Sequence, residues 1–242
     1  MENIPKISKG DIVHKVVKGG LSAIPFAGGL AAEFFDLVIK PPLSKRLDAW
    51  MESVTEGLKG LEEKVEGFKV EDLSQNEMFI TTFMQATQAA TRNHQKEKLE
   101  ALKNAALNAA LPNAPEDDIK LIFLNFVDIL TPWHLRILRF FNNPKEWLHN
   151  HEIKVDINDL PFGYSSVKVL ERIFPKLQNK GNFCEIIVRD LLTKDLLSGD
   201  AITRVLPEDH IFSPGTSELG KQFIQFITSP FEKDNNLNPQ QI

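Results

Sequence analysis

Cysteine and tyrosine are the scarcest residues of this 242-residue chain, which has one of each against 17 phenylalanines. A single cysteine, Cys184, excludes an internal disulfide and predicts a reducing, cytoplasmic environment. The histidines and this cysteine show no spacing that would suit zinc. Basic residues are also fewer than acidic ones: 28 Lys and Arg against 33 Asp and Glu give the chain a net charge of −5. The chain as a whole therefore has no attraction for nucleic acid or anionic lipid.

Catalytic and nucleotide-binding motifs are missing as well. There is no Walker sequence, no G-x-G-x-x-G and no serine-centred elbow. The triplet 149–151 (His-Asn-His) has the letters of a nuclease motif, but that motif needs these residues spread over a ββα metal fold. Three acids at 116–118 are explained by the positive end of a helix dipole, and His134 fits the edge of a core. We predict a non-enzymatic protein with no catalytic residue, no metal and no cofactor.

A long apolar run free of charge is absent too. The most apolar stretch, Gly19–Ile39, contains Glu33 and Asp36, and each acid near a helix centre costs roughly 2.5–3.5 kcal/mol in a bilayer. Pro25 and four glycines weaken a helix further. A stable membrane span is therefore not expected, and we predict two pieces separated at residues 22–29.

The second piece, Leu30–Ile39, predicts an amphipathic helix. Its polar side contains Glu33, Asp36 and Lys40. Four apolar residues share the other face and form the candidate membrane or partner face: Leu30, Phe34, Leu37 and Val38. Two interpretations stay open. The helix docks on the protein's own core, or the segment leaves the core to meet a bilayer or a partner, which would place the chain at the periphery of the inner membrane.

The body, residues 41–150, reads as a helical bundle behind this N-terminal segment of residues 1–40. Pro41-Pro42 predicts the end of one helix and the start of the next. The next helix has an apolar stripe at steps of three and four: Leu43, Leu47, Trp50, Val54, Leu58, Leu61, Val65 and Phe68. Ser74, with Glu77 three residues later, predicts a capping box. Thr131 is predicted to cap a central helix that begins at Pro132.

Residues 160–230 predict a winged-helix-like module, followed by a polar tail at 231–242. A polar linker at 149–159 leads to two helices, over 165–174 and from 182 through 197. Two short extended runs, 201–206 and 211–212, predict a β-ribbon, and Thr216 is predicted to cap the closing helix. The fold class is therefore mainly α, with a multi-helix bundle and a short C-terminal β-ribbon.

The second helix of this module is a poor DNA reader on charge. It has two cations against three acids: Glu185, Arg189, Asp190, Lys194 and Asp195. Phosphate contacts supply most of the affinity for a duplex, so nucleic acid is not an expected partner. Packing or protein contact is the preferred role.

Two short motifs resemble the Abi-alpha-like group of bacterial abortive-infection proteins. They are 130–132 (Leu-Thr-Pro), before the central helix, and 216–223 (Thr-Ser-Glu-Leu-Gly-Lys-Gln-Phe), which corresponds to the group's T-P-x-G-x-x-F. The second motif departs from the group, with Ser-Glu-Leu where proline and one apolar residue usually precede glycine. The resemblance implies a role in phage defence and supplies no catalytic residues.

These observations leave three functional hypotheses. The first is a defence protein whose N-terminal apolar helix engages a membrane or partner when triggered. The second is a cytosolic interaction or scaffold module that binds a protein partner or itself. The third, least favoured, is a winged-helix DNA-binding regulator.

Overall fold

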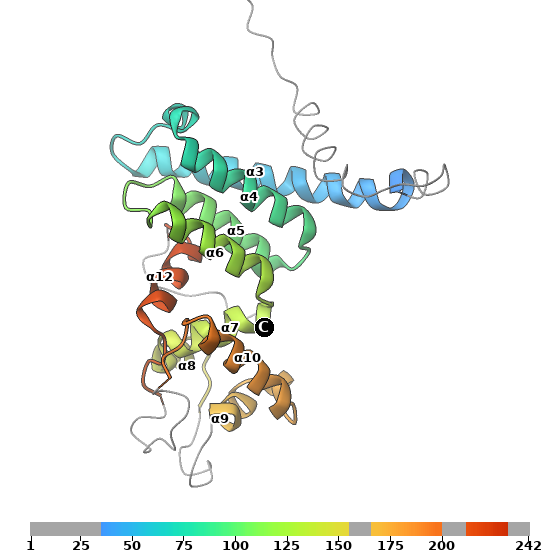
Figure 1. The fold of residues 1–242 in the computed structure, drawn as a ribbon, viewed down its shortest axis with the longest axis vertical. Helices are drawn as coiled ribbons and strands as arrows, with labels where there is room; N and C mark the ends of the chain where they lie inside the picture. The colour runs from blue at the N-terminus through green and yellow to red at the C-terminus, as the bar shows by residue number, and fades with distance from the viewer. Residues whose placement is uncertain (1–34, 155–165, 200–211, 232–242) are drawn as a thin grey trace, which may run out of the picture. The chain divides into compact units, whose positions relative to one another are not determined.

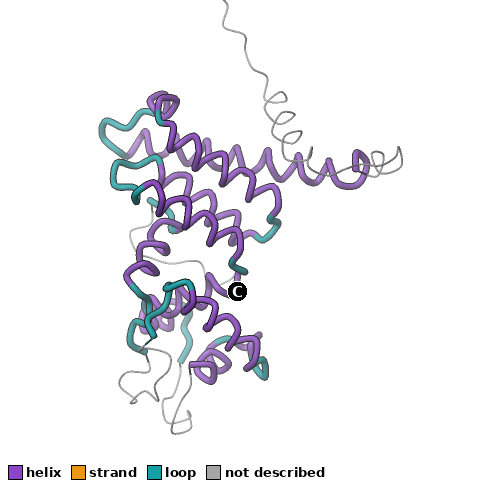
Figure 2. Tube along the Cα trace, viewed as in Figure 1, coloured by secondary structure: helices purple, strands orange, loops and turns teal. Residues whose placement is uncertain are grey.

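The computed structural model describes residues 35–154, 166–199 and 212–231, and these fold almost entirely into helices (Figures 1 and 2). The prediction of a mainly α protein is confirmed. The chain divides into two compact units, residues 1–124 and 125–242, and the division falls inside helix α6 (Asp117–Ile129). This division comes from contacts between residues, whereas the boundary predicted in the linker at 149–159 comes from composition. The predicted boundary stays a prediction.

Helix α3 (Lys40–Lys64) is the long helix that the apolar stripe predicts. Five residues of that stripe form its buried face: Leu47, Trp50, Val54, Leu58 and Leu61. Pro41 and Pro42 occupy its first turn, where the missing N–H groups would have no helical partner anyway. They start the helix as expected but do not follow a break. A π-helical turn, η1 (Phe35–Ile39), runs directly into α3, and Ile39 keeps helical angles.

Helices α4 (Glu77–Arg92) and α5 (Lys96–Ala109) pack with α3 to form the core of the first unit. Small residues let the two helices approach closely, and all of these are buried: Ala86, Ala89, Ala90, Ala101, Ala105 and Ala106. Gly57 of α3 faces Leu107 of α5, and an added Cβ would lie only 2.6 Å from the leucine Cδ1. The close packing around these alanines and Gly57 therefore belongs to one three-helix core.

The predicted cap of α4 is wrong by two residues. Asn76 is the N-cap, and its Oδ1 accepts a hydrogen bond from the N–H of Phe79 at 2.9 Å. Ser74 lies instead in a 3₁₀ helix, η2 (Val70–Gln75), where its hydroxyl donates to the carbonyl of Glu71. Asparagine and serine cap equally well, so the preceding 3₁₀ turn decides which of them meets the helix.

The second unit is built on helix α7 (Pro132–Asn142), whose buried residues surround much of its axis, as predicted. Thr131 is its N-cap and Pro132 opens it, also as predicted. Helix α8 (Pro144–Asn150) follows directly. Aromatic rings fill the space between them and the next helix, with Trp147 5.0 Å and Trp133 5.7 Å from Phe174 between ring centroids.

Two helices joined by a short turn complete the α7 core: α9 (Ser166–Ile173) and α10 (Gly181–Thr193), with the 3₁₀ turn η4 (Pro175–Leu177) between them. The sequence predicted that the second helix would reach residue 197, but it ends at Thr193. Asp195 then adopts a positive φ of 55°, which turns Leu196 and Leu197 into the core.

The closing helix, α12 (Glu218–Ile227), is capped by Ser217 and not by the predicted Thr216. The Ser217 hydroxyl accepts a hydrogen bond from the N–H of Gly220 at 2.9 Å. Thr216 forms an isolated antiparallel bridge with Leu197. This bridge is the only β pairing among the described residues. The predicted ribbon strands, 201–206 and 211–212, lie outside them except for Phe212, which is in a turn.

Among the glycines that the structure describes, Gly220 has the least room for a side chain. A Cβ added there would lie 2.1 Å from the carbonyl oxygen of Leu196 and 3.0 Å from its carbon. Three residues on, Phe223 is fully buried and its ring meets Phe126 edge to face at 5.7 Å. The glycine and the phenylalanine of the motif at 216–223 therefore both serve the packing of α12.

Candidate functional site

The candidate membrane or partner face is exposed wherever the structure describes it. Leu37 is 80% and Val38 47% exposed, whereas Leu47, the first buried residue of α3, is 2% exposed. Leu30 and Phe34, the other two members, lie outside the described residues. Leu37 and Val38 are exposed because they lie just before α3, and the first turns of α3 already extend beyond the ends of α4 and α5 (Figure 1).

One hydrogen bond joins the first part of α3 to the end of α4. Arg46 Nη1 donates to the carbonyl of Thr91 at 3.0 Å, one residue before α4 ends at Arg92. The side chain of Arg46 therefore reaches the last turn of α4. Leu37 and Val38 face outward, and whether the whole segment docks on the core or leaves it stays a prediction.

The charge around this end of α3 differs from that of the whole chain. Residues 37–47 contain three cations, Lys40, Lys45 and Arg46, and no acid, while Asp36 and Asp48 stand directly on either side of them. The chain overall has a net charge of −5. An apolar pair next to lysines and arginine is the composition of helices that lie in a membrane interface.

A second polar arrangement joins α7 to α10. His134 Nδ1 accepts a hydrogen bond from the Thr131 N–H at 3.2 Å, and the Thr131 hydroxyl lies 2.8 Å from the same nitrogen. In the neutral ring the proton is therefore on Nε2, which lies 3.2 Å from Asp190 Oδ2. Asp190 also pairs with Lys194.

This cluster has the residue types of a nucleophile, base and orienting acid, but its geometry is that of a helix cap. The backbone N–H and the hydroxyl of Thr131 both lie within hydrogen-bond distance of His134 Nδ1. The imidazole therefore helps to cap the first turn of α7. His134 is 7% exposed, as expected for a histidine at the core edge. We assign the cluster a structural task, which is to hold α7 and α10 in register.

A shallow depression of about 510 Å³ opens where α9 turns into α10. Its lining is polar apart from one ring, and comprises Lys168, Glu171, Asn179, Lys180, Gly181, Asn182 and Phe183. Lys168 and Glu171 pair at 2.9 Å, and the hydrogen bond and charge of the carboxylate raise the pKa of the lysine. The sequence analysis missed this site because its residues come from two helices and the turn between them.

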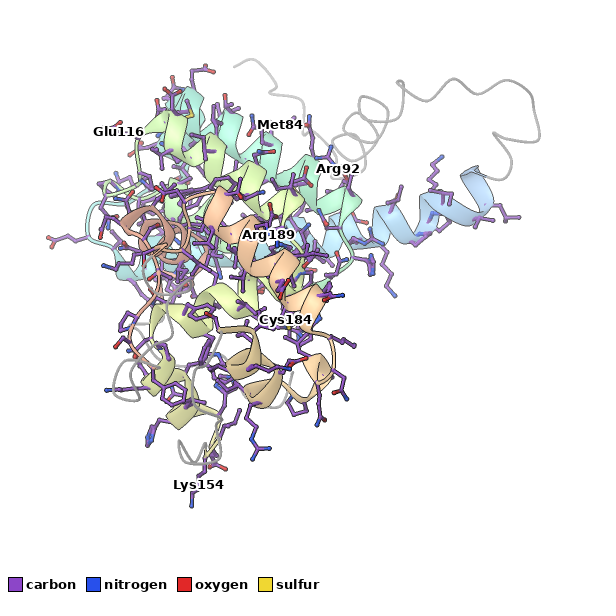
Figure 3. All side chains as sticks on the ribbon, turned by 60° about the horizontal axis from the view of Figure 1, so that its bottom comes forward. Met84, Arg92, Glu116, Lys154, Cys184 and Arg189 are labelled. Atoms are coloured by element: carbon purple, nitrogen blue, oxygen red, sulfur yellow. The ribbon has the colours of Figure 1, made fainter. Side chains whose placement is uncertain are left out.

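Cys184 lies on the buried side of α10, labelled together with Arg189 in Figure 3. Burial, and secondarily the charge of Glu171, raises the pKa of its thiol. A raised pKa keeps the thiol neutral and unreactive.

The outward face of α10 is more apolar than predicted. Only its charged residues were considered above, but the Ile186 side chain is 61% exposed and that of Phe183 is 38% exposed. Ile187 and Val188 fill the core instead. Three consecutive branched residues cannot all face inward on a helix, and the position of α7 decides which one points to solvent.

No match emerged when the chain was compared with protein-family models, with curated proteins and with solved structures. Within residues 35–154, 166–199 and 212–231, no three His, Cys, Asp or Glu side chains gather as metal ligands. In the same part of the chain, no helix combines the length and the apolarity needed to cross a bilayer.

Proposed function

We propose that this chain is a non-enzymatic bacterial defence protein of the abortive-infection type, whose N-terminal apolar face binds an anionic membrane surface when triggered. The exposure of Leu37 and Val38 beside three cations is the observation that carries the membrane part. The defence part rests on the resemblance of the motifs at 130–132 and 216–223. The protein would act from the cytoplasm, at the periphery of the inner membrane.

The described residues supply only part of the binding energy. Burying a leucine or valine side chain contributes about 1.5–3 kcal/mol, and a cation near an anionic leaflet contributes about 1 kcal/mol. Leu37, Val38 and the three cations together would give weak, reversible attachment. Stable attachment would need the rest of the face, Leu30 and Phe34, so the proposal assigns all four residues to the same contact.

Vesicle co-sedimentation of the full chain tests this. We expect binding to vesicles of phosphatidylserine and phosphatidylcholine, and little binding to phosphatidylcholine alone. The double variant Leu37→Asp, Val38→Asp should lose most of it, as should Phe34→Asp. Met84→Asp, at an exposed apolar position of α4 (Figure 3), is the matched control and should bind like the wild type. Equal binding of all variants would refute the membrane role.

A growth assay tests the defence role separately. Expression in bacteria should slow growth for the wild type and not for the double variant, if membrane contact causes the effect. Deletion of residues 1–40 should leave a folded protein without effect, because the buried stripe of α3 begins at Leu47. If the truncated chain unfolds instead, the segment belongs to the core, and that result would favour the cytosolic scaffold hypothesis.

A cytosolic interaction module is the second candidate, and the exposed Phe183 and Ile186 favour it. In this hypothesis residues 160–230 form a winged helix that contacts protein. The backbone at the bridge supports the ribbon, since Ser198 N–H donates to Gly215 O at 2.9 Å and Ser217 N–H to Leu196 O at 3.2 Å. Alternating bonds of this kind are found at the base of an antiparallel hairpin.

DNA reading by this module is the least supported candidate. The outward face of α10 presents an isoleucine, a phenylalanine and Glu185 beside Arg189, and a duplex needs cations there. A titration with mixed-sequence duplex at low salt tests it. Binding that weakens steeply with added salt would restore the regulator hypothesis, and no binding would remove it.

A further inference from the structure

The middle of α10 presents an exposed apolar centre flanked by opposite charges. Ile186 is 61% exposed, Phe183 lies three residues before it, and Glu185 and Arg189 are both exposed on the same side of the helix. The opposite side is fixed in the core by Cys184, Ile187, Val188 and Leu191. The exposed side chains therefore stand on a rigid helix and not on a loop.

This pattern is self-complementary. In an antiparallel pair of identical helices related by a twofold axis, residues equally far before and after the axis meet. With the axis midway between residues 186 and 187, Ile186 lies within one residue of the level of its own copy and packs beside it. Glu185 of one helix then lies beside Arg189 of the other, and the same pair repeats on the second chain. At 1.5 Å per residue the remaining offset is within reach of an arginine side chain.

We propose that α10 pairs antiparallel with α10 of a second copy of this chain. A membrane is a poor occupant for this face because it would bury the charges of Glu185 and Arg189 beside the apolar centre. A nucleic acid is a poor partner for this face because the face carries an isoleucine and a glutamate where a phosphate backbone would need cations. A second copy gives the isoleucine an apolar partner and pairs each glutamate with an arginine. This charge complementarity is the reason to choose a second copy as the partner.

The size of the face sets the strength of the pair. Helix α10 has 13 residues. Two such helices bury less than the roughly 1,200 Å² at which standard stable interfaces begin, so the dimer should be weak and concentration-dependent. Sedimentation equilibrium of the full chain should show a mass rising from 27.4 kDa toward twice that value as concentration increases.

Charge reversal gives the decisive test. Glu185→Arg and Arg189→Glu each place like charges together twice per dimer, so each should weaken association at least about tenfold. An equimolar mixture of the two variants restores both opposite-charge pairs in the heterodimer, and should associate as the wild type does. Ile186→Asp should abolish association, and circular dichroism would show that its helices persist, since the side chain is exposed.

Matched controls separate this surface from others. Glu56→Arg and Lys59→Glu reverse an exposed pair of the same two signs on α3, and should leave association unchanged. The double variant Leu37→Asp, Val38→Asp should also still dimerise, which distinguishes this proposal from the membrane face. A wild type that stays monomeric up to about 1 mM, which corresponds to only about −4 kcal/mol of binding, overturns the proposal. So does a mixture of the two charge-reversed variants that fails to associate, or dimerisation that depends on Leu37 and Val38.

Discussion

Gly220→Ala should destabilise the second unit more than its size suggests. The new methyl group would lie 2.1 Å from the carbonyl oxygen of Leu196, 3.0 Å from its carbonyl carbon and 3.3 Å from its Cα. All three atoms are backbone, so no rotamer change relieves the overlap. Helix α12 would have to move away by about 1 Å, since non-bonded carbon and oxygen atoms rarely approach closer than van der Waals contact.

The cost can be estimated from what that movement disturbs. Forced overpacking costs about 1–3 kcal/mol, and the hydrogen bond from Ser217 N–H to Leu196 O, 3.2 Å long, contributes about 1 kcal/mol more. Phe223 and Ile227, both fully buried, would also lose part of their packing. We expect the free energy of unfolding to fall by about 2–4 kcal/mol, and the melting temperature of this unit by about 10 °C.

Urea denaturation followed by circular dichroism measures this change. Gly199→Ala is the matched control, because nothing lies within 4 Å of the added methyl group and the residue has an ordinary φ. It should change stability by less than about 0.5 kcal/mol. If the two alanine variants unfold at the same urea concentration, the close approach of α12 to Leu196 is not a feature of the folded protein.

Three further predictions concern caps, faces and the thiol. Asn76→Ala should cost about 1 kcal/mol by urea denaturation and Ser74→Ala clearly less, and the reverse order would restore the sequence-based cap. Ile187→Ala should cost about 2–5 kcal/mol and Ile186→Ala under about 0.5, so similar losses would contradict the assigned faces of α10. Cys184 should resist alkylation until the protein unfolds. Because its pKa is raised in the folded state, the unfolded thiol ionises first, and stability should decline above about pH 8.5, less steeply in Cys184→Ala. Rapid alkylation of the native protein, or identical pH slopes, would contradict its burial.

The candidate face at the N-terminus shows where sequence reasoning stops. Its periodicity predicted that Leu37 and Val38 would share a side of a helix, but periodicity cannot say whether that side is covered. Coverage depends on the lengths of α4 and α5, which end before they reach these residues. The three cations of residues 37–47 are visible in the sequence, and Asp36 and Asp48 on either side of them offset part of their charge.

The sequence by itself determined the helices and most of their buried stripes. The spacing of Leu47, Trp50 and Val54, and the Thr-Pro start of α7, depend on local geometry that repeats along any helix. The tertiary structure alone decided that Ile186 faces outward, and that Gly220 must be a glycine. Both depend on which neighbour lies opposite, and a contact between segments distant in the chain leaves no periodic trace in either one.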